Sequence, residues 1–376
     1  MRLWPLRRAA EAPSLATDVL LIAEARLRER VEDVFAVRER QIRGGVIIFR
    51  GEFTSDATRA LDVLLGRFRP LGYTPFVRRD GTGAVIQAWP LTDTVARPRI
   101  GVNVILFVLT CLSTVMAGSG AFMSFDPFVE PRRLLTGVPF AATLLSILGV
   151  HEFGHYFTAR YYHAAVTLPY FIPAPPPFLF GTLGAVIKMK SPARDRDSLF
   201  DIAAAGPLAG LVVAIPALWL GLAWSTVARV PPGAHVVFGD SLLMQFLVYL
   251  KFGHLAPGFD VFVHPVALAG WVGLFVTALN LFPVGQLDGG RIAYALFGAR
   301  HRAVGVATFV GLMLMGVLTH SVNWFVWGAL IFFLVGFHHS PPLDDLTPLS
   351  PGRRVVGALC LVLLVLLIPP VPIQIG

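Results

Sequence analysis

The sequence predicts an α-helical polytopic membrane protein with about seven transmembrane helices, a re-entrant or strand-like segment, and a small soluble α+β domain at the N-terminus. Three observations support this fold class. The 376 residues are 55% hydrophobic and only 14% charged, whereas about a quarter of the residues of an ordinary soluble domain are charged. Apolar runs long enough to cross a bilayer recur after residue 99. The residues before 100, in contrast, hold 12 of the 23 acidic side chains, which indicates a separate solvated part.

The N-terminal part shows helix-like and strand-like patterns in turn. Helices are predicted at 18–34 and 55–68, and strand-like pieces at 45–49, 73–77 and 84–89. We therefore predict a cytoplasmic α+β domain over residues 1–98, the alternative being a solvated arm without a core of its own. The start of the chain lacks an apolar run of secretory-signal length, so we expect this domain to stay uncleaved on the side of synthesis.

Residues 99–376 are predicted to form the membrane part. Its expected crossings are 100–117, 134–160, 199–224, 264–283, 303–320, 322–338 and 355–370. With a cytoplasmic N-terminus, the inner connections hold nine Lys and Arg residues and the outer ones four, as the positive-inside rule requires. The shorter apolar piece 242–252 is expected to lie at the interface or to re-enter the bilayer.

The segment 166–192 suits neither a spanning helix nor an ordinary loop. Five prolines interrupt it between aromatic residues, and 184–189 (GAVIKM) then has the pattern of a strand. A non-helical backbone at membrane depth is tolerated only where protein or a water-filled cavity satisfies its polar groups. We therefore expect this segment to line a cavity.

Charge and cysteine content exclude other classes. The formal net charge is +8, but much of the excess lies beside apolar segments, so we interpret it as membrane topology and expect no nucleic-acid partner. Cys111 and Cys360 lie within apolar runs with no second cysteine or histidine cluster around them. Neither a disulfide framework nor a thiolate metal site is indicated.

The second apolar segment ends in His151-Glu152-Phe153-Gly154-His155, an HExxH pattern. Positions i and i+4 share one face of a helix, so His151 and His155 can bind one metal ion, for which zinc is the usual choice. Glu152 can act as general base toward water that the metal activates. Ionisable groups within an apolar helix are costly unless they are paired or metal-bound, so the context favours a site over solvated side chains.

A catalytic zinc needs a third protein ligand and an open fourth position. Asp288 is the best donor, because Pro283 and Gly285 should break the fourth crossing and let the chain fold back. Residue spacing alone leaves an alternative open, in which Asp288 simply begins the next helix at the interface.

Both motifs resemble those of the site-2 protease family of intramembrane zinc peptidases. The family pattern pairs HExxH with a later NxxPxxxLDG, which corresponds here to Asn280, Pro283, Leu287, Asp288 and Gly289. The resemblance covers residues 134–302. It implies one zinc ion held by the two histidines and the aspartate, with the glutamate of HExxH as catalytic base.

Further segments resemble the family branch that includes plastid and cyanobacterial members and lacks PDZ and CBS domains. These are 181–192 (GTLGAVIKMKSP) and 203–210 (AAAGPLAG). The resemblance implies that the strand-like piece pairs with an unwound substrate, which assigns substrate binding to Gly184, Ala185, Val186 and Ile187, with Asn280 of the second motif. In the alternative, this piece only packs in the cavity wall.

The resemblance implies a metalloendopeptidase that cleaves membrane-anchored proteins in or near their transmembrane segments, in regulated intramembrane proteolysis. We expect the lipid bilayer and a membrane-anchored substrate as partners, and an unknown regulator that acts at the N-terminal domain. The expected location is a prokaryotic cell membrane, with the active-site opening toward the cytoplasm. Alternatives are a membrane zincin with a glutamate as third ligand, and a non-catalytic chaperone or scaffold that retains the fold.

Overall fold

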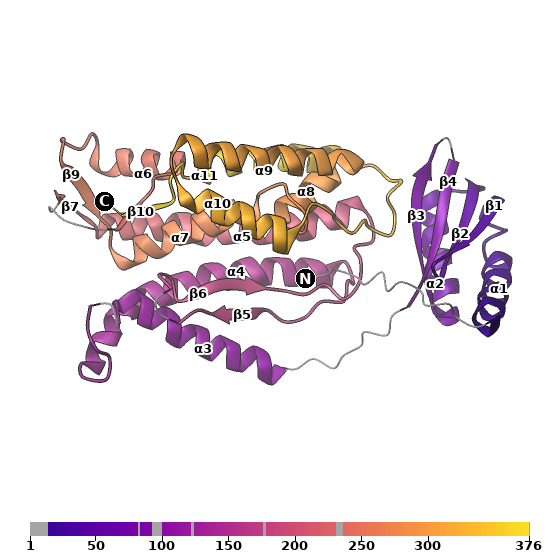
Figure 1. Cartoon of the computed structure of the whole chain (residues 1–376), viewed down its shortest axis with the longest axis horizontal. Coiled ribbons are helices and arrows are strands. Elements are labelled where there is room, and N and C mark those ends of the chain that lie inside the picture. Colours follow the sequence, from indigo (N-terminus) through magenta and orange to yellow (C-terminus); the bar gives the residue numbers. More distant parts are fainter. Residues whose placement is uncertain are drawn as a thin grey trace. The chain divides into compact units, whose positions relative to one another are not determined.

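The computed structural model describes residues 14–81, 83–91, 100–121, 124–175, 178–230 and 236–375. It divides into two compact units. The first contains Met1–Ala96 together with Pro192–Leu199 and Ser340–Ser350, and the second contains Arg97–Ser191, Phe200–His339 and Pro351–Gly376. Figure 1 shows the elements of both units.

The first unit is an antiparallel sheet with two helices, as predicted for an α+β domain. Its elements are α1 (Ser14–Glu29), β1 (Phe35–Arg43), β2 (Val46–Phe53), α2 (Ala57–Phe68), β3 (Tyr73–Asp80) and β4 (Gly83–Pro90), and the strand order is β1-β2-β4-β3. Phe35, Phe49 and Leu61 are fully buried in its core. The unit therefore has its own hydrophobic core, which the solvated-arm alternative lacked.

Two details of this unit differ from the expected pattern. The predicted helix 18–34 ends at Glu29, and Phe35–Arg43 forms a strand that the sequence did not indicate. Most side chains of β1 are exposed, and its charged residues hide the period-two alternation. Charged side chains are common on the edge strand of a sheet, where β1 lies.

Two segments that come much later in the sequence, Pro192–Leu199 and Ser340–Ser350, also belong to this unit. The amide of Val77 donates to the carbonyl of Leu343 (2.7 Å), and the amide of Asp345 donates to the carbonyl of Val77 (3.0 Å). Leu343 joins the buried core, and its amide bonds the carbonyl of Ala193. The first unit is therefore built from three separate stretches of chain.

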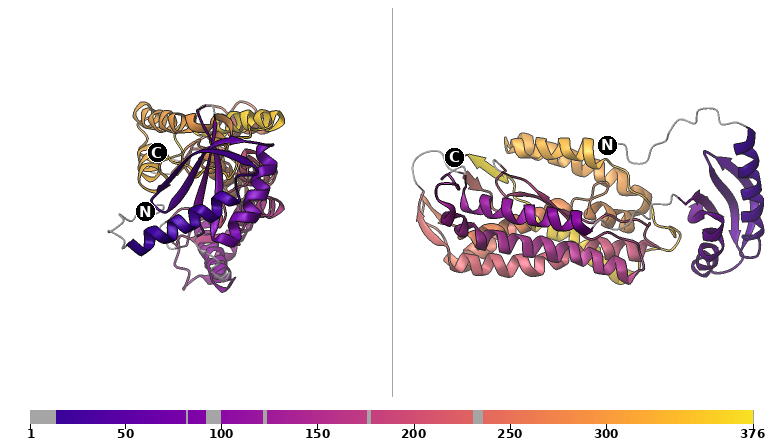
Figure 2. Two further views of the ribbon diagram at one scale, coloured as in Figure 1. Left: turned by 90° about the vertical axis from the view of Figure 1, so that its right-hand side faces the viewer. Right: turned by 90° about the horizontal axis from the view of Figure 1, so that it is seen from below.

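The second unit is mostly helical. Its helices are α3 (Ile100–Ser119), α4 (Val138–Tyr161), α5 (Arg196–Ala223), α6 (Leu242–Phe252), α7 (Pro265–Asn280), α8 (Asp288–Phe297), α9 (His301–Leu318), α10 (Val322–Leu330) and α11 (Pro351–Leu367). The first four residues of α5 lie in the other unit. Figure 2 shows from a second direction that these helices run side by side as a bundle.

Among the described residues, four helical segments are long and apolar enough to cross a membrane. They are Ile100–Ser119, Pro131–Tyr161, Arg196–Ala223 and Asp288–Leu318. The remaining three predicted crossings correspond to shorter helices: α7, α10 with the π-turn Ile331–Val335, and α11. Seven crossings are therefore not confirmed, although a helix is present at each predicted position.

The proline-rich segment forms a two-stranded hairpin inside the helical unit. β5 (Tyr170–Pro173) pairs antiparallel with β6 (Thr182–Val186). Asn103 of α3 donates to the carbonyls of Leu168 and Pro169, at 3.1 and 2.8 Å. In Figure 1, β5 runs beside α3 and β6 beside α4. The β5–β6 ladder and Asn103 therefore satisfy part of the backbone of this segment with protein, as a non-helical backbone at membrane depth requires.

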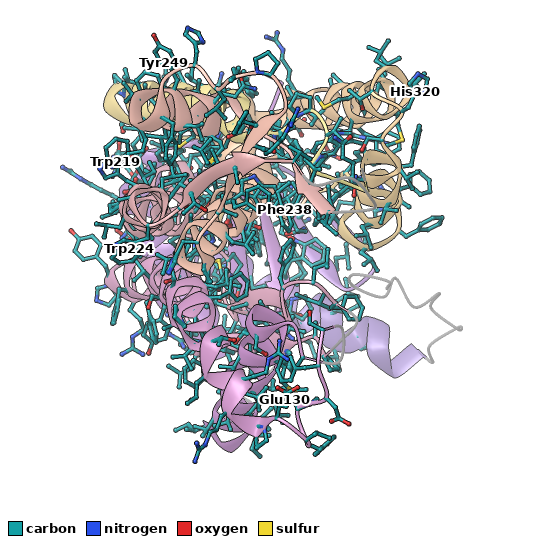
Figure 3. All side chains as sticks on the ribbon, turned by 90° about the vertical axis from the view of Figure 1, so that its left-hand side faces the viewer. Glu130, Trp219, Trp224, Phe238, Tyr249 and His320 are labelled. Carbon is teal, nitrogen blue, oxygen red and sulfur yellow. The ribbon has the colours of Figure 1, made fainter. Side chains whose placement is uncertain are left out.

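Aromatic side chains gather at the end of the helical unit that Figure 3 shows. Trp224 follows α5 and Tyr249 lies in α6, and both are more than half exposed. The short pairs β7 (Thr226–Arg229) with β9 (Phe259–Phe262), and β8 (Val236–Phe238) with β10 (Ile373–Ile375), also lie at this end. Exposed Trp and Tyr residues mark the boundary between hydrocarbon and water in membrane proteins.

Candidate metal centre

The HExxH residues lie on one buried face of α4. His151, Glu152 and His155 lie in the C-terminal half of this apolar helix, and each is at most 5% exposed. The Nε2 atoms of the two histidines are 3.1 Å apart. The helical spacing therefore places both imidazoles at one point, as predicted.

The chain that follows α7 carries Asp288 to that point. α7 ends at Asn280 before Pro283, and Gly285 takes a positive φ of 51° in the turn. A Cβ atom on Gly289 would lie 1.9 Å from the carbonyl oxygen of Leu281, so only glycine permits this return. α8 then begins at Asp288. Asp288 thus begins a helix, as the alternative held, but its carboxylate lies at the histidine pair.

The three donor atoms fit a single zinc ion. Oδ2 of Asp288 lies 3.0 Å from Nε2 of His155 and 3.5 Å from Nε2 of His151. Four ligands at about 2.05 Å in a tetrahedron lie about 3.3 Å from one another. The three measured separations bracket that value, and all donor atoms lie within 4.8 Å of one another. Two imidazoles and a carboxylate are a usual donor set for catalytic zinc, with one position left open.

A carbonyl of α5 orients one of the imidazoles. Nδ1 of His155 lies 2.6 Å from the carbonyl oxygen of Ile202. The proton therefore resides on Nδ1, and Nε2 presents its lone pair toward Asp288 and His151. Such hydrogen bonds behind a ligand set its tautomer and raise its basicity.

Glycines of α5 make room for both imidazoles. A Cβ on Gly206 would lie 2.1 Å from Nε2 of His155, and a Cβ on Gly210 would lie 3.3 Å from the His151 ring. These two residues, and Ile202, were not recognised as site residues from the sequence. The signal that could have found them is the small-residue spacing of 203–210 on an apolar helix, which permits close helix approach.

We expect Gly206→Ala to remove most of the bound metal. The added methyl would overlap the Nε2 atom that must hold the ion, and the helix backbone cannot retreat without breaking its packing. Zinc content of the purified protein is the measurement, with Gly149→Ala as the matched control because nothing lies within 4 Å of its Cβ. Equal zinc in both variants would contradict this account of α5.

One of the predicted substrate-binding residues, Ile187, lies near Glu152. The backbone amide of Ile187, directly after β6, lies near the Glu152 carboxyl and interacts with it. Val186 and Ala185 pair with Tyr170 and Phe171 of β5. Gly184 has a φ of +100° and open space at its Cβ position. The structure therefore brings Ile187 close to the site, while the role of 184–187 in substrate binding stays a prediction.

Asn280, the last residue of α7, lies beside His151. Its Nδ2 atom is 3.4 Å from Nε2 of His151. Since this nitrogen can donate two hydrogen bonds, it can hold a carbonyl oxygen beside the metal position. The structure thus places Asn280 next to one of the metal donors, and its contact with substrate stays a prediction.

Arg291 is a charged neighbour that the sequence analysis counted only as a topology signal. It follows Asp288 by three residues on α8, so both side chains leave the same face of the helix. Its Nη1 atom lies 3.5 Å from the sulfur of Met189. Its charge also acts on the Glu152 carboxyl.

A family model and the curated relatives of this chain point to the same class of protein, the zinc metalloproteases. Residues 139–319 match the model of peptidase family M50. The chain is 33% identical over 299 residues to the probable zinc metalloprotease EGY1, chloroplastic, of Arabidopsis thaliana, covering 72% of this chain and 53% of that protein. It is 31% identical over 277 residues to the probable zinc metalloprotease EGY2, chloroplastic, of Oryza sativa subsp. indica, covering 72% and 48%.

The comparisons also set limits. The chain spans about half the length of the curated relatives it matches, and no solved structure matches it significantly. Both relatives are named chloroplastic, which argues against the expected prokaryotic cell membrane. A membrane location itself is supported by the family and by the four long apolar helices.

Proposed function

Because the chain belongs to peptidase family M50, the site-2 protease family, we propose that it is an intramembrane zinc endopeptidase that cleaves membrane-anchored proteins in or near their transmembrane segments. One observation carries the proposal. His151, His155 and Asp288 converge on one point beside Glu152, and α4 and α8–α9 belong to segments of membrane-spanning length. A soluble substrate would not reach donors at that depth, whereas a substrate already in the membrane would.

The hairpin offers a way to hold an extended substrate. Of the described residues, only β5 pairs with β6, so β6 has one edge without a partner strand. A transmembrane helix must be opened before its peptide bonds can reach a metal, and the opened backbone then needs hydrogen-bond partners. A strand edge supplies them in the manner of β-augmentation. The proximity of the Ile187 amide to the Glu152 carboxyl supports this arrangement.

The reaction assigned to this site is hydrolysis of a peptide bond. A bound zinc ion supplies Lewis-acid polarisation of water and of the scissile carbonyl. Glu152 takes a proton from the attacking water and delivers it to the leaving amine as the C–N bond breaks. Ile202 holds the His155 ring in the tautomer that leaves Nε2 free. Asn280 positions the substrate carbonyl beside His151.

Location and orientation belong to the same proposal. The inner connections of the predicted topology carry the larger number of Lys and Arg residues. We place the first unit and the opening of the site on that positively charged side, so that the released fragment leaves there. Binding of a regulator to the first unit would then act from the same side.

Removal of the metal tests the proposed function directly. The purified protein in lipid should cleave a single-span substrate, lose cleavage after treatment with a chelator, and regain it with about one equivalent of zinc. The reason is that the three donors form one site. Cleavage is measured by mass spectrometry of the products. Zinc-loaded protein that cleaves no single-span substrate would instead favour the scaffold alternative.

A soluble peptide with the same scissile sequence separates membrane proteolysis from general proteolysis. We expect the membrane-embedded version to be cleaved and the soluble version to be cleaved much more slowly, because the donors lie in an apolar bundle. Equal rates for both substrates would show a zinc protease that does not depend on the bilayer.

A further inference from the structure

The chain that follows β6 carries two lysines and no acidic residue before Asp195. From Phe153 to Arg194 the sequence holds no Asp or Glu, while Lys188 and Lys190 follow β6 directly. Backbone bonds hold this stretch in place: the amide of Thr167 donates to the carbonyl of Lys188 (3.0 Å), and that of Lys190 to the carbonyl of Ala165 (2.7 Å). The backbone that carries Lys188 and Lys190 is therefore held in place where an extended substrate would continue beyond the site.

Arg291 brings a third cation to the same place from α8. Met189, whose sulfur its guanidinium contacts, lies between the two lysines and two residues after Ile187. Both the Ile187 amide and the charge of Arg291 lie close enough to the Glu152 carboxyl to act on it. Arg291 thus stands between the cationic strand end and the catalytic centre.

The guanidinium of Arg291 has no carboxylate partner in the described part of the chain. Within 4.0 Å of it no Asp or Glu oxygen forms an ion pair, and its hydrogen-bond partner is a thioether, which is a weak acceptor. The carboxylate of Asp288, one turn away, is directed to the histidines. A half-buried arginine without a bound anion has unused hydrogen-bond donors. Its guanidinium can therefore bind a carboxylate of another molecule.

The flanking residues of most transmembrane segments carry the same sign of charge as Lys188 and Arg291. Their cytoplasmic flanks are enriched in Lys and Arg, so a cationic exit repels the most common transmembrane segments. Repulsion of the wrong partners is an established way to obtain specificity. An acidic side chain near the cleaved bond would pair with Arg291 and avoid that repulsion.

We propose that Arg291, with Lys188 as a second cation, selects substrates that carry Asp or Glu within a few residues of the cleaved bond, on the side where the substrate leaves β6. This inference rests on the proposed function, because it names the substrate class of that same site. Arg291 acts on specificity by direct ion pairing with the substrate, and it neither binds the metal nor transfers a proton.

A binding experiment separates this role from catalysis. Three single-span peptides in lipid, identical except for two flanking positions occupied by Asp, Asn or Lys, are titrated against zinc-loaded Glu152→Gln protein. We expect the Asp peptide to bind about tenfold more tightly than the Lys peptide, with a preference that shrinks at high salt. In Arg291→Gln, added to the same background, the preference should fall to about twofold.

Controls distinguish recognition from folding. Arg302→Gln removes the same charge at an exposed position of α9 and should keep the full preference, and Arg291→Lys should keep part of it. Zinc content must remain near one equivalent in each variant. If Arg291→Gln fails to fold, the test uses two other measurements: the salt dependence of the Asp preference in the Glu152→Gln protein, and the reduced preference expected in Arg291→Lys.

The outcomes also separate the two proposals. Equal binding and equal cleavage of the three peptides would overturn the specificity inference while leaving the protease intact. An Asp preference that depends on Arg291, without cleavage of any peptide by the protein with Glu152 intact, would support the recognition role and overturn the proposed hydrolysis. A preference that persists in Arg291→Gln would assign recognition elsewhere and overturn the role of Arg291.

Discussion

Glu152→Gln should abolish cleavage and leave the bound zinc in place. General acid–base catalysis by one side chain contributes about 10²- to 10⁴-fold, and here the same carboxylate must both accept and deliver a proton. Glutamine has nearly the same shape and keeps an oxygen on the side chain, next to the Ile187 amide. The metal donors are untouched, since they are His151, His155 and Asp288.

Two measurements check this prediction on one sample. Product formation from a single-span substrate should fall at least a hundredfold, while zinc analysis should still give one equivalent. Glu130→Gln is the matched control, because Glu130 is about half exposed and, in the part of the chain that the structure describes, forms an ion pair only with Arg133. Full turnover by Glu152→Gln would remove Glu152 from the mechanism.

Asp288→Ala should release the zinc ion and therefore also abolish cleavage. Loss of a residue that merely supports a ligand lowers metal affinity about 10- to 100-fold, so loss of a ligand itself should exceed that range. The carboxylate is 14% exposed and lies within 3.5 Å of both Nε2 atoms, so no other described Asp or Glu can replace it without rearrangement.

Zinc retention against a competing chelator is the measurement. Asp260→Ala, at an exposed carboxylate outside the cluster, should retain zinc as the wild type does. Retention of zinc by Asp288→Ala would favour a membrane zincin with a glutamate as third ligand, the alternative that the sequence left open. The contrast with Glu152→Gln is informative, because one variant should lose the metal and the other only the reaction.

The positions of the helices could be predicted closely because bilayer-length apolar runs are a local signal. Each expected crossing corresponds to a helix, and 134–160 became Val138–Tyr161 with a preceding 3-10 turn. The number of crossings was less certain. α7 is 16 residues long, and much of it is buried against other helices. Hydrophobicity alone does not distinguish a helix packed inside a protein from one that spans lipid.

In the first unit the core was predictable and its edges were not. The amphipathic helix 55–68 appears as Ala57–Phe68, whose buried residues recur on one face. The strand β1 was missed because its exposed charges hide the alternation. The docking of Leu343 beside Val77 joins residues more than 260 positions apart in the sequence, and no periodic pattern encodes a contact of that range.

The sequence by itself determined the pair of histidines, the glutamate between them and the apolar context, because helical spacing and hydrophobic length are properties of neighbouring residues. Only the tertiary structure decided that Asp288, 133 residues from His155, brings its carboxylate to the same point. It also decided that Gly206 leaves room for the His155 ring and that Ile187 touches Glu152. These contacts depend on how separate segments pack, and packing is a property of the whole fold.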